Sequence, residues 1–192
     1  MDLKLIYGNM RALCEAPQMM LHYADIPYEY KMVWDHYGSS WAEVKKDIIF
    51  NRLPILIINE DKYLWQSNTI IRYLSNLTKT KPSDEFQLAY CDAVFESTHE
   101  MFSPLNPTIN MTFGEKYNSN KKKLLEDILP NSLNNFEKLL QNSSGNFFIG
   151  NDPFYCDFNA YHHFSMCLIL DKNIFSNFPN LKKFINNFEK LN

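Results

Sequence analysis

Tyr7 is the side chain whose place in the sequence best suits chemistry on a bound ligand. It ends the short apolar run Leu3–Tyr7, and Gly8 and Asn9 follow it and favour a turn into a helix. A phenol there can donate a hydrogen bond to an anion such as a thiolate, and the positive end of the helix dipole adds to the attraction. A free thiol is mostly protonated at neutral pH, so a site that uses a thiolate needs such help. On these residues alone, packing at a strand end explains Tyr7 better than chemistry.

A second group of candidate residues surrounds Pro54. Proline cannot donate to a sheet ladder, so Pro54 belongs at an edge or at the start of the apolar run Ile55–Ile58. There it leaves the backbone of Leu53 available to pair with an extended peptide ligand. Gln66 and Ser67 then open a helix, in which we expect the Ser67 hydroxyl to cap the first turn and the amides to suit a carboxylate.

The strands and helices that hold these groups are predicted in the order β-α-β-α-β-β-α. The strand Leu3–Tyr7 is expected in the middle of a sheet. The helix after it runs to about Ala24 and, because Pro17 removes a helical hydrogen bond, either begins near Glu15 or is kinked. Tyr28–Val33 is expected to return as a parallel strand.

A surface turn of helix, a hairpin and a helix complete this first domain. Trp41–Lys46 is predicted as the single turn of helix. Ile55–Ile58 and Lys62–Trp65 form the hairpin, with turn residues at 59–61. Apolar residues at helical spacing follow Ser67. We therefore predict an α/β domain over residues 1–77.

The second predicted domain, residues 86–192, is all-α. A polar stretch with a proline, residues 78–85, is the predicted linker. The pattern over 103–113 includes Pro104 and Pro107 and fits either a helix or a bend. The segments with a clear helical pattern are Phe86 to about Met101, Asn118–Leu140, Cys156–Leu170 and Leu181–Leu191.

Composition excludes several classes of protein. The chain has 192 residues, 45% of them hydrophobic and 21% charged, and a formal charge of −3 that provides no basic field for nucleic acid. No apolar run approaches the roughly 20 residues of a membrane span, and the N-terminus lacks a signal peptide's apolar region, so we expect a cytoplasmic protein. The four cysteines are widely spaced with no Cys-x-x-Cys, which predicts free thiols and no metal site.

Several motifs together resemble the soluble glutathione transferases. Leu-Pro-Ile-Leu from Leu53, the hairpin, Gln66-Ser67 and Ile-x-Arg-Tyr-Leu from Ile70 resemble the thioredoxin-like N-terminal domain of that family. Over Ile6–Tyr30 the chain is most similar to the sigma type, which includes haematopoietic prostaglandin D synthases. The resemblance implies a cis Leu53–Pro54 bond, whereas spacing and the roughly 5–6% frequency of cis X–Pro bonds favour trans.

The resemblance also implies roles for individual residues, with glutathione as co-substrate. Tyr7 would stabilise the glutathione thiolate, and Arg11 would structure the turn or add to the positive field. With Pro54 and Gln66-Ser67 in the same chain, we favour this role of Tyr7 over packing. The residues that would bind glutathione are Trp41, Lys45, Arg52, Leu53, Pro54, Gln66 and Ser67. Three of them, Trp41, Lys45 and Arg52, are individually as well explained by packing or solvation.

An acidic stripe on the first helix of the second domain suggests a homodimer. Asp92, Glu96 and Glu100 repeat every four residues, and like charges at this spacing destabilise a helix. By resemblance, Glu100 would reach the amino group of glutathione bound to the other subunit. A solvated acidic face, or one that binds a cation or a basic partner, is the alternative.

The chain departs from the family pattern at several positions. Leu13 replaces a second arginine, Gly8 replaces an aromatic residue, and Phe154 stands where a hydroxyl cap should precede Asp157, leaving Asp157 to accept from first-turn amides alone. The sequence also ends at Asn192, before a segment that helps to roof the hydrophobic site in many members.

We predict an enzyme that conjugates the glutathione thiolate to a small hydrophobic electrophile. The alternatives are a non-catalytic binding or scaffold protein of this fold and a glutathione-dependent isomerase. A cysteine-based reductase is disfavoured because the turn from Tyr7 to Arg11 contains no cysteine.

Overall fold

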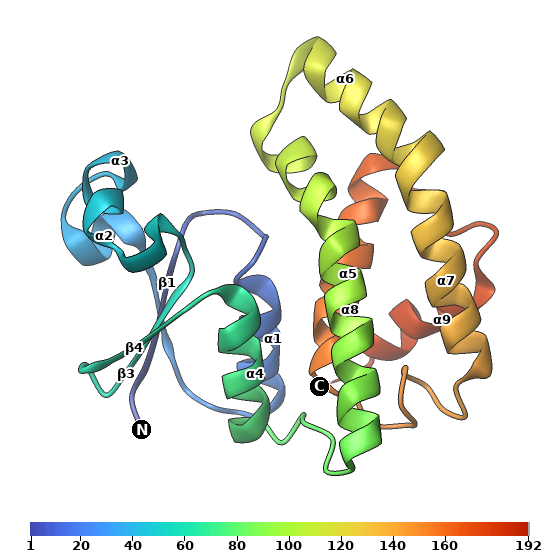
Figure 1. The fold of residues 1–192 in the computed structure, drawn as a ribbon, viewed down its shortest axis with the longest axis horizontal. Helices are drawn as coiled ribbons and strands as arrows, with labels where there is room; N and C mark the ends of the chain where they lie inside the picture. Colours follow the sequence, from blue (N-terminus) through green and yellow to red (C-terminus); the bar gives the residue numbers. More distant parts are fainter. Residues whose placement is uncertain (192) are drawn as a thin grey trace. The chain divides into compact units, whose positions relative to one another are not determined.

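A computed structural model describes residues 1–191 and divides the chain into two compact units, Met1–Lys81 and Pro82–Asn192 (Figure 1). The division falls inside residues 78–85, which we continue to propose as the linker between domains 1–77 and 86–192. The predicted fold class, a thioredoxin-like α/β domain followed by an all-α domain, is confirmed. Within the described residues, no helix combines the length and the apolar content that a membrane span requires.

The first unit is built on a four-stranded sheet in the order β2-β1-β3-β4. Strand β1, Leu3–Tyr7, lies in the middle as predicted, parallel to β2, Glu29–Met32, and antiparallel to β3, Ile55–Ile58. Strand β4, Lys62–Trp65, completes the predicted hairpin with β3. The residues of β3 are buried throughout, which is why this strand is a continuous apolar run instead of an alternating one.

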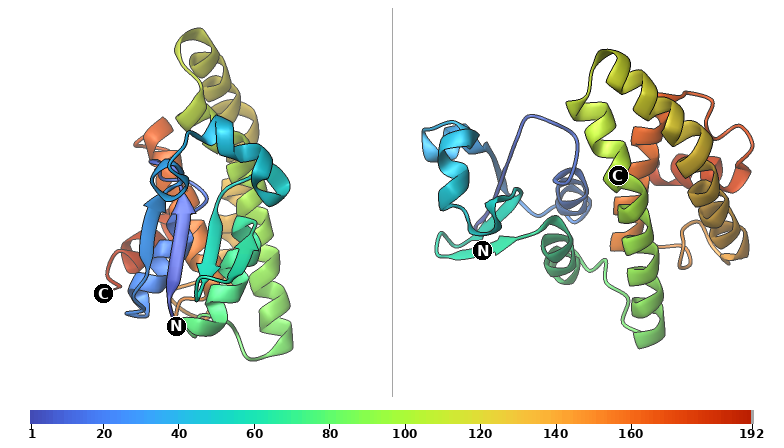
Figure 2. Two further views of the ribbon diagram at one scale, coloured as in Figure 1. Left: turned by 90° about the vertical axis from the view of Figure 1, so that its left-hand side faces the viewer. Right: turned by 45° about the horizontal axis from the view of Figure 1, so that its top comes forward.

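Helices cover both faces of this sheet (Figures 1 and 2). Helices α1, Glu15–Tyr23, and α4, Ser67–Leu77, pack against each other on one face. The short helices α2, Val33–Tyr37, and α3, Trp41–Val44, lie toward the other face. Helix α3 occupies the predicted surface turn, whereas α2 was not predicted. Helix α1 begins at Glu15, one of the two predicted arrangements, so its proline falls in the first turn, where a missing amide costs little.

The predicted cap of α4 is wrong. Ser67 is the first helical residue, and the preceding Gln66 is the N-cap, with φ 70°, ψ 118° and no side-chain cap. The Ser67 hydroxyl donates instead to Oδ1 of Asn68 at 3.4 Å. With Ser67 as the cap, the helix would have begun at Asn68. Because the N-cap is Gln66, with its positive φ, the helix begins one residue earlier, at Ser67.

The second unit is helical, and α8 is its central element (Figure 2). Helix α8, Tyr155–Leu170, is buried over most of its surface and packs along α5, Glu85–Met111. Because α8 is buried on nearly every side, and its polar residues are buried with the apolar ones, it lacks the polar face of a surface helix. The remaining helices are α6, Gly114–Lys123, α7, Leu129–Asn142, and α9, Pro179–Phe188.

Three of the predicted helices in this unit have different limits in the structure. Helix α5 continues to Met111 through both prolines, and the hydroxyls of Thr108 and Thr112 donate to carbonyls one turn back, at 2.9 and 2.7 Å. The predicted helix Asn118–Leu140 is instead two helices joined by a π-helical turn, Leu124–Ile128. Pro130 lies in the first turn of α7 and cannot donate to a carbonyl of the preceding turn, which favours the break. The last helix ends at Phe188, earlier than predicted.

Asp157 joins the start of α8 to the loop before it. Its carboxylate accepts from the amide of Phe154 at 2.8 Å and from the amide of Phe148 at 3.0 Å, and its own amide donates to the Phe154 carbonyl at 2.8 Å. The expectation that it would accept only from first-turn amides is wrong, because the loop folds back onto it. Burial raises the pKa of Asp157 to about 7, while the two amides act in the opposite direction.

We predict that Asp157→Ala destabilises the protein by about 2–4 kcal/mol, because one buried and one partly buried amide lose their acceptor. Urea unfolding of the variant and the wild type measures the difference. The control is Asp152→Ala, which changes an exposed carboxylate on the same loop and is expected to shift stability by less than about 0.5 kcal/mol. Equal stability of the two variants would contradict a structural role for Asp157.

Candidate functional site

Strand pairing brings three of the predicted site residues to one edge of the sheet. Strands β1, β3 and β4 are adjacent and successively antiparallel, and Tyr7 ends β1, Pro54 precedes β3 and Gln66 follows β4. The three residues therefore lie side by side. The Leu53–Pro54 bond is cis, as the family resemblance implied and against the expectation from spacing.

The Tyr7 phenol is almost enclosed, with 7% of the residue exposed. Its oxygen accepts a hydrogen bond from the backbone amide of Leu13 at 3.4 Å. Burial raises the pKa of Tyr7 to about 12, the Leu13 amide lowers it, and the nearby Cys14 thiol raises it. Tyr7 is therefore protonated at neutral pH, and since its oxygen is the acceptor in this contact, its own proton is available. It is suited to donate a hydrogen bond and not to act as a base.

A tyrosine from the neighbouring strand supports the turn after Tyr7. The hydroxyl of Tyr30, on β2, donates to the carbonyl oxygen of Gly8 at 2.7 Å. Sequence reasoning missed Tyr30 and treated Leu13 only as a departure from the family pattern. The Leu13 contact comes from the backbone, so no side-chain signal could have revealed it. For Tyr30, the aromatic residue in a predicted strand adjacent to β1 was the available signal.

Arg11 lies in the same turn, with its side chain directed to α1. Its Nε donates to Oε1 of Glu15 at 2.7 Å, an ion pair with a spacing of four residues and an Arg11 side chain that is about half exposed. This contact fits the first of the two roles expected for Arg11, that of structuring the turn. Partial exposure limits the pair to about 1 kcal/mol or less.

Four of the residues expected to bind glutathione differ in their surroundings. Trp41 and Leu53 are partly buried against one hydrophobic cluster of the sheet, so both contribute to packing. Lys45 and Arg52 are exposed. Lys45 follows α3, and its backbone amide donates to the Trp41 carbonyl. Trp41 thus has a structural role whether or not it also touches a ligand.

The N-terminus of α4 is the part of this edge that suits an anion. The first amides of a helix have no acceptor within it and point along its axis with the positive end of the dipole. Gln66 is exposed, and Ser67 behind it is nearly buried with 8% exposed. A carboxylate placed here would accept from these amides.

Glu100 belongs to the other unit, and the structure explains part of its acidic stripe. Asp92 accepts from the hydroxyl of Tyr155 at 2.6 Å, so one carboxylate of the stripe serves to join α5 to α8. Glu100 is exposed on α5. Its predicted contact with a ligand stays a prediction.

Models of known families match most of the chain. Residues 1–76 match the glutathione S-transferase N-terminal domain, and residues 99–192 match the glutathione S-transferase C-terminal domain. Among solved structures, the chain is similar to the Pi-class glutathione S-transferase of Onchocerca volvulus, with a TM-score of 0.85 and 26% identity over 99% of this chain and 88% of that one. It is also similar to the rat hPGDS complexed with a quinoline, with a TM-score of 0.87 and 25% identity over 100% and 92% of the two chains.

Curated relatives agree with the family models. A glutathione S-transferase of Plasmodium yoelii yoelii is 33% identical over 153 residues, which cover 77% of this chain and 70% of the relative. Glutathione S-transferase P of Caenorhabditis elegans is 28% identical over 192 residues, which cover 98% and 88% of the two chains. The chain belongs to the glutathione S-transferase family. It is a glutathione transferase enzyme, with glutathione as co-substrate.

We predict that Tyr30→Phe lowers the turnover of glutathione conjugation by up to about 10-fold, because the turn after Tyr7 loses a hydrogen bond that positions it. Stability is expected to fall by about 0.5–1.5 kcal/mol. Steady-state kinetics and thermal unfolding measure the two effects. The matched control is Tyr28→Phe. It also removes a tyrosine hydroxyl, but that hydroxyl contacts Gln18 and His22 and not the turn after Tyr7. A loss of turnover that is equal in both variants would contradict the positioning role of Tyr30.

Proposed function

We propose that glutathione binds at the sheet edge formed by Tyr7, Pro54 and Gln66 and that Tyr7 donates a hydrogen bond to its thiolate. The observation that carries this proposal is the state of the phenol. Burial keeps Tyr7 protonated, and its oxygen already accepts from the Leu13 amide, which leaves the proton for a ligand. A protonated phenol can donate a hydrogen bond to a thiolate without neutralising it. This contact lowers the pKa of the glutathione thiol, so the fraction of thiolate rises at neutral pH.

Along this edge, an extended tripeptide would meet a different group at each position. Its γ-glutamyl carboxylate would accept from the first amides of α4 beside Gln66 and Ser67. Its backbone would pair with Leu53, which precedes the cis proline. Its glycine end would lie toward Trp41, with the exposed cations Lys45 and Arg52 as partners for the second carboxylate.

The reaction is substitution or addition at an electrophilic carbon of a small hydrophobic compound. The thiolate sulfur forms a bond to that carbon, and in a substitution the leaving group departs with the electron pair of its bond. With 1-chloro-2,4-dinitrobenzene, the products are the dinitrophenyl thioether and chloride. Tyr7 contributes by stabilising the attacking anion, and Arg11 by holding the turn that places Tyr7.

We predict that Tyr7→Phe lowers the turnover of this conjugation by about 30- to 1,000-fold, the range for loss of one donor worth roughly 2–4 kcal/mol. Glutathione affinity, measured in parallel by calorimetry, is expected to change by less than about 3-fold because the remaining contacts persist. The control is Tyr117→Phe, on a helix of the other unit. Unchanged turnover in Tyr7→Phe would remove the catalytic assignment, whereas turnover and affinity lost together would make Tyr7 a binding residue.

A glutathione-dependent isomerase is the second candidate function, supported by the likeness to the rat hPGDS structure. Conjugation and isomerisation would use the same thiolate and differ in the shape of the pocket for the second substrate. Assays of glutathione conjugation and of glutathione-dependent isomerisation with the same enzyme preparation show which of the two reactions the protein catalyses faster.

We further propose a cytoplasmic homodimer in which Glu100 interacts with the amino group of glutathione bound to the partner. Two neighbouring apolar side chains support an interface on the first unit, since Ile49 is 53% and Phe50 61% exposed. Phe50 also has φ 64°, a left-handed conformation that is uncommon for an aromatic residue. Exposed apolar groups of this kind favour association, and two-fold symmetry would use the same surface on both copies.

Glu100→Gln is expected to raise the glutathione concentration for half-saturation by about 2- to 5-fold, consistent with loss of a contact worth up to about 1 kcal/mol. Sedimentation should show dimers for both proteins. The control is Glu115→Gln, an exposed carboxylate on α6. A monomeric wild type at micromolar concentration would reject the dimer. An unchanged half-saturation in Glu100→Gln would reject the contact alone.

A further inference from the structure

Helices α5 and α8 are joined by a buried polar cluster that the proposed function does not use. Thr98 of α5 is fully buried, and two side chains of α8 reach it. Asn159 donates from Nδ2 to the Thr98 hydroxyl at 3.0 Å, and Nδ1 of His163 lies 3.0 Å from the Thr98 carbonyl oxygen. Asn159 and His163 are four residues apart and therefore lie on the same face of α8. Both contacts tie α8 to α5 at one point.

The contact with Thr98 sets the protonation of the His163 ring. A carbonyl oxygen only accepts hydrogen bonds, so Nδ1 carries a proton and donates it to this contact. In the neutral ring Nε2 then carries none, and acid would add the second proton there. The ring is enclosed, since His163 is 1% exposed and stacks on the ring of Phe102 with 4.0 Å between centroids and 6° between planes. A second proton would therefore place a charge inside the helical core.

The groups around His163 do not compensate such a charge. Its titratable neighbours are two further histidines, His162 on α8 and the half-buried His99 on α5, with ring centroids 5.5 and 6.3 Å from its own. Within the described residues, α9 and the other segments packed on α8 contribute no charged group that acts on His163. The carboxylate of Glu96 acts on His99 instead. Burial and the two histidines hold the pKa of His163 well below its ordinary value, while the Thr98 carbonyl acts in the opposite direction.

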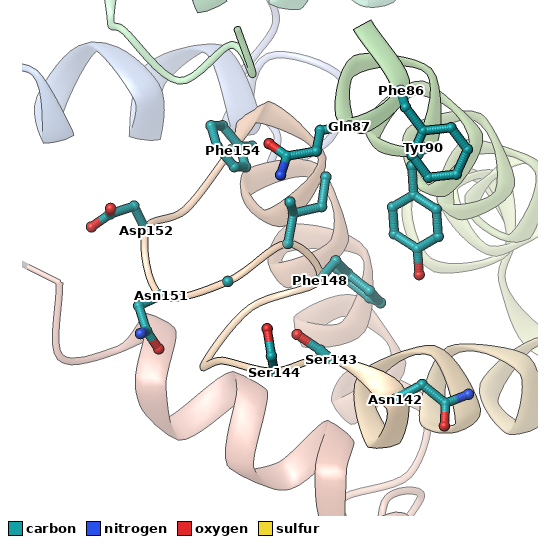
Figure 3. A pocket seen from close by; sticks show the side chains of 12 residues that line it. Phe86, Gln87, Tyr90, Asn142, Ser143, Ser144, Phe148, Asn151, Asp152 and Phe154 are labelled. Atoms are coloured by element: carbon teal, nitrogen blue, oxygen red, sulfur yellow. The ribbon is translucent and has the colours of Figure 1, made fainter. Parts of the chain in front are cut away.

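The cavity of the helical unit does not bring water to this cluster. A pocket of about 570 Å³ lies between the start of α5 and the loop 143–154, and none of the three histidines lines it (Figure 3). Because His163 is also closed to solvent at the surface, its protonation requires α8 to separate locally from α5. The charged ring then opposes the return of the two helices to their packed arrangement.

We propose that the contact between Thr98 and His163 makes the packing of α8 on α5 sensitive to pH, stable while the ring is neutral and weakened by mild acid. An opened chain takes up a proton near the ordinary histidine value of about 6.5, whereas the packed ring does not. The stabilisation is therefore complete above about pH 7 and is lost progressively as the pH falls below about 6.5. The cluster is in the unit Pro82–Asn192, so this proposal does not depend on the glutathione site of the unit Met1–Lys81.

Replacement of the ring by a neutral amide tests the proposal. His163→Gln keeps a side chain that can donate to the Thr98 carbonyl but cannot become charged. One buried neutral histidine raises the unfolding equilibrium constant about 10-fold between pH 7.5 and 5.5, because only the unfolded chain binds the proton. We therefore expect acidification over this range to raise the constant about 10-fold more in the wild type than in His163→Gln. Urea unfolding of the full chain, followed by far-UV circular dichroism at both pH values, measures the difference.

Two comparisons separate this effect from other titrations. Asp157 acts in the opposite direction, because burial raises its pKa to about 7 and its protonation favours the folded state as the pH falls. Both proteins retain Asp157, so its contribution cancels. The matched variant is His22→Gln, at an exposed histidine of α1. The same pH dependence in wild type and His163→Gln, or an equal change in His22→Gln, would overturn the proposal.

Nuclear magnetic resonance of the wild-type chain tests the protonation state without a substitution. Isotope-labelled histidine gives one ring signal for each of the five histidines, and through-space contacts with Thr98 and Phe102 identify that of His163. We expect this signal to keep the chemical shift of the neutral ring down to about pH 5.5 in the folded protein. A His163 signal that titrates between about pH 6 and 7 while the chain stays folded would reject the proposal.

Discussion

The antiparallel pairing of β1 with β3 is the interaction on which the candidate active site depends. Tyr7 is the last residue of one strand and Pro54 immediately precedes the other, so their proximity follows from the register of the ladder. The next pair, β3 with β4, adds the start of α4 to the same edge in the same way. A slip by one residue would turn every side chain of a strand to the opposite face and would also separate these three groups. Burial of all four residues of β3 opposes such a slip.

Much of the fold was predictable because local patterns and tertiary structure agree. The apolar runs that became β1 and β3 and the turn residues of the hairpin all gave clear signals. The structure departed from prediction where a local rule met a tertiary constraint. Pro104 and Pro107 left a helix or a bend equally open, and in the structure α5 runs through both prolines while it packs along α8. Ser67 resembled a helix cap, but the backbone of Gln66 took that position.

Family motifs pointed to the candidate site residues, but not to the contacts that these residues make. Family motifs led to Tyr7, the cis proline and the start of α4, whereas the hydrogen bonds around Tyr7 involve the Leu13 amide and the Tyr30 hydroxyl, to which no motif pointed. Asp157 shows the same limit in the helical unit. The sequence indicated Asp157 only as an acceptor for first-turn amides, but its partner Phe148 lies nine residues away in a loop whose path depends on tertiary contacts.

The contact between the Leu13 amide and Tyr7 affects which substitutions the turn can accept during evolution. The donor to Tyr7 is a peptide N–H, which nineteen of the twenty amino acids carry, so any replacement at residue 13 except proline keeps it as long as the turn holds its shape. The side chain of residue 13 is therefore not needed for this contact. It can be replaced while the phenol of Tyr7 keeps its hydrogen bond from the backbone amide. Divergent members of a lineage can therefore lose a recognisable side-chain signature here and still present the same electrostatic surroundings to the tyrosine.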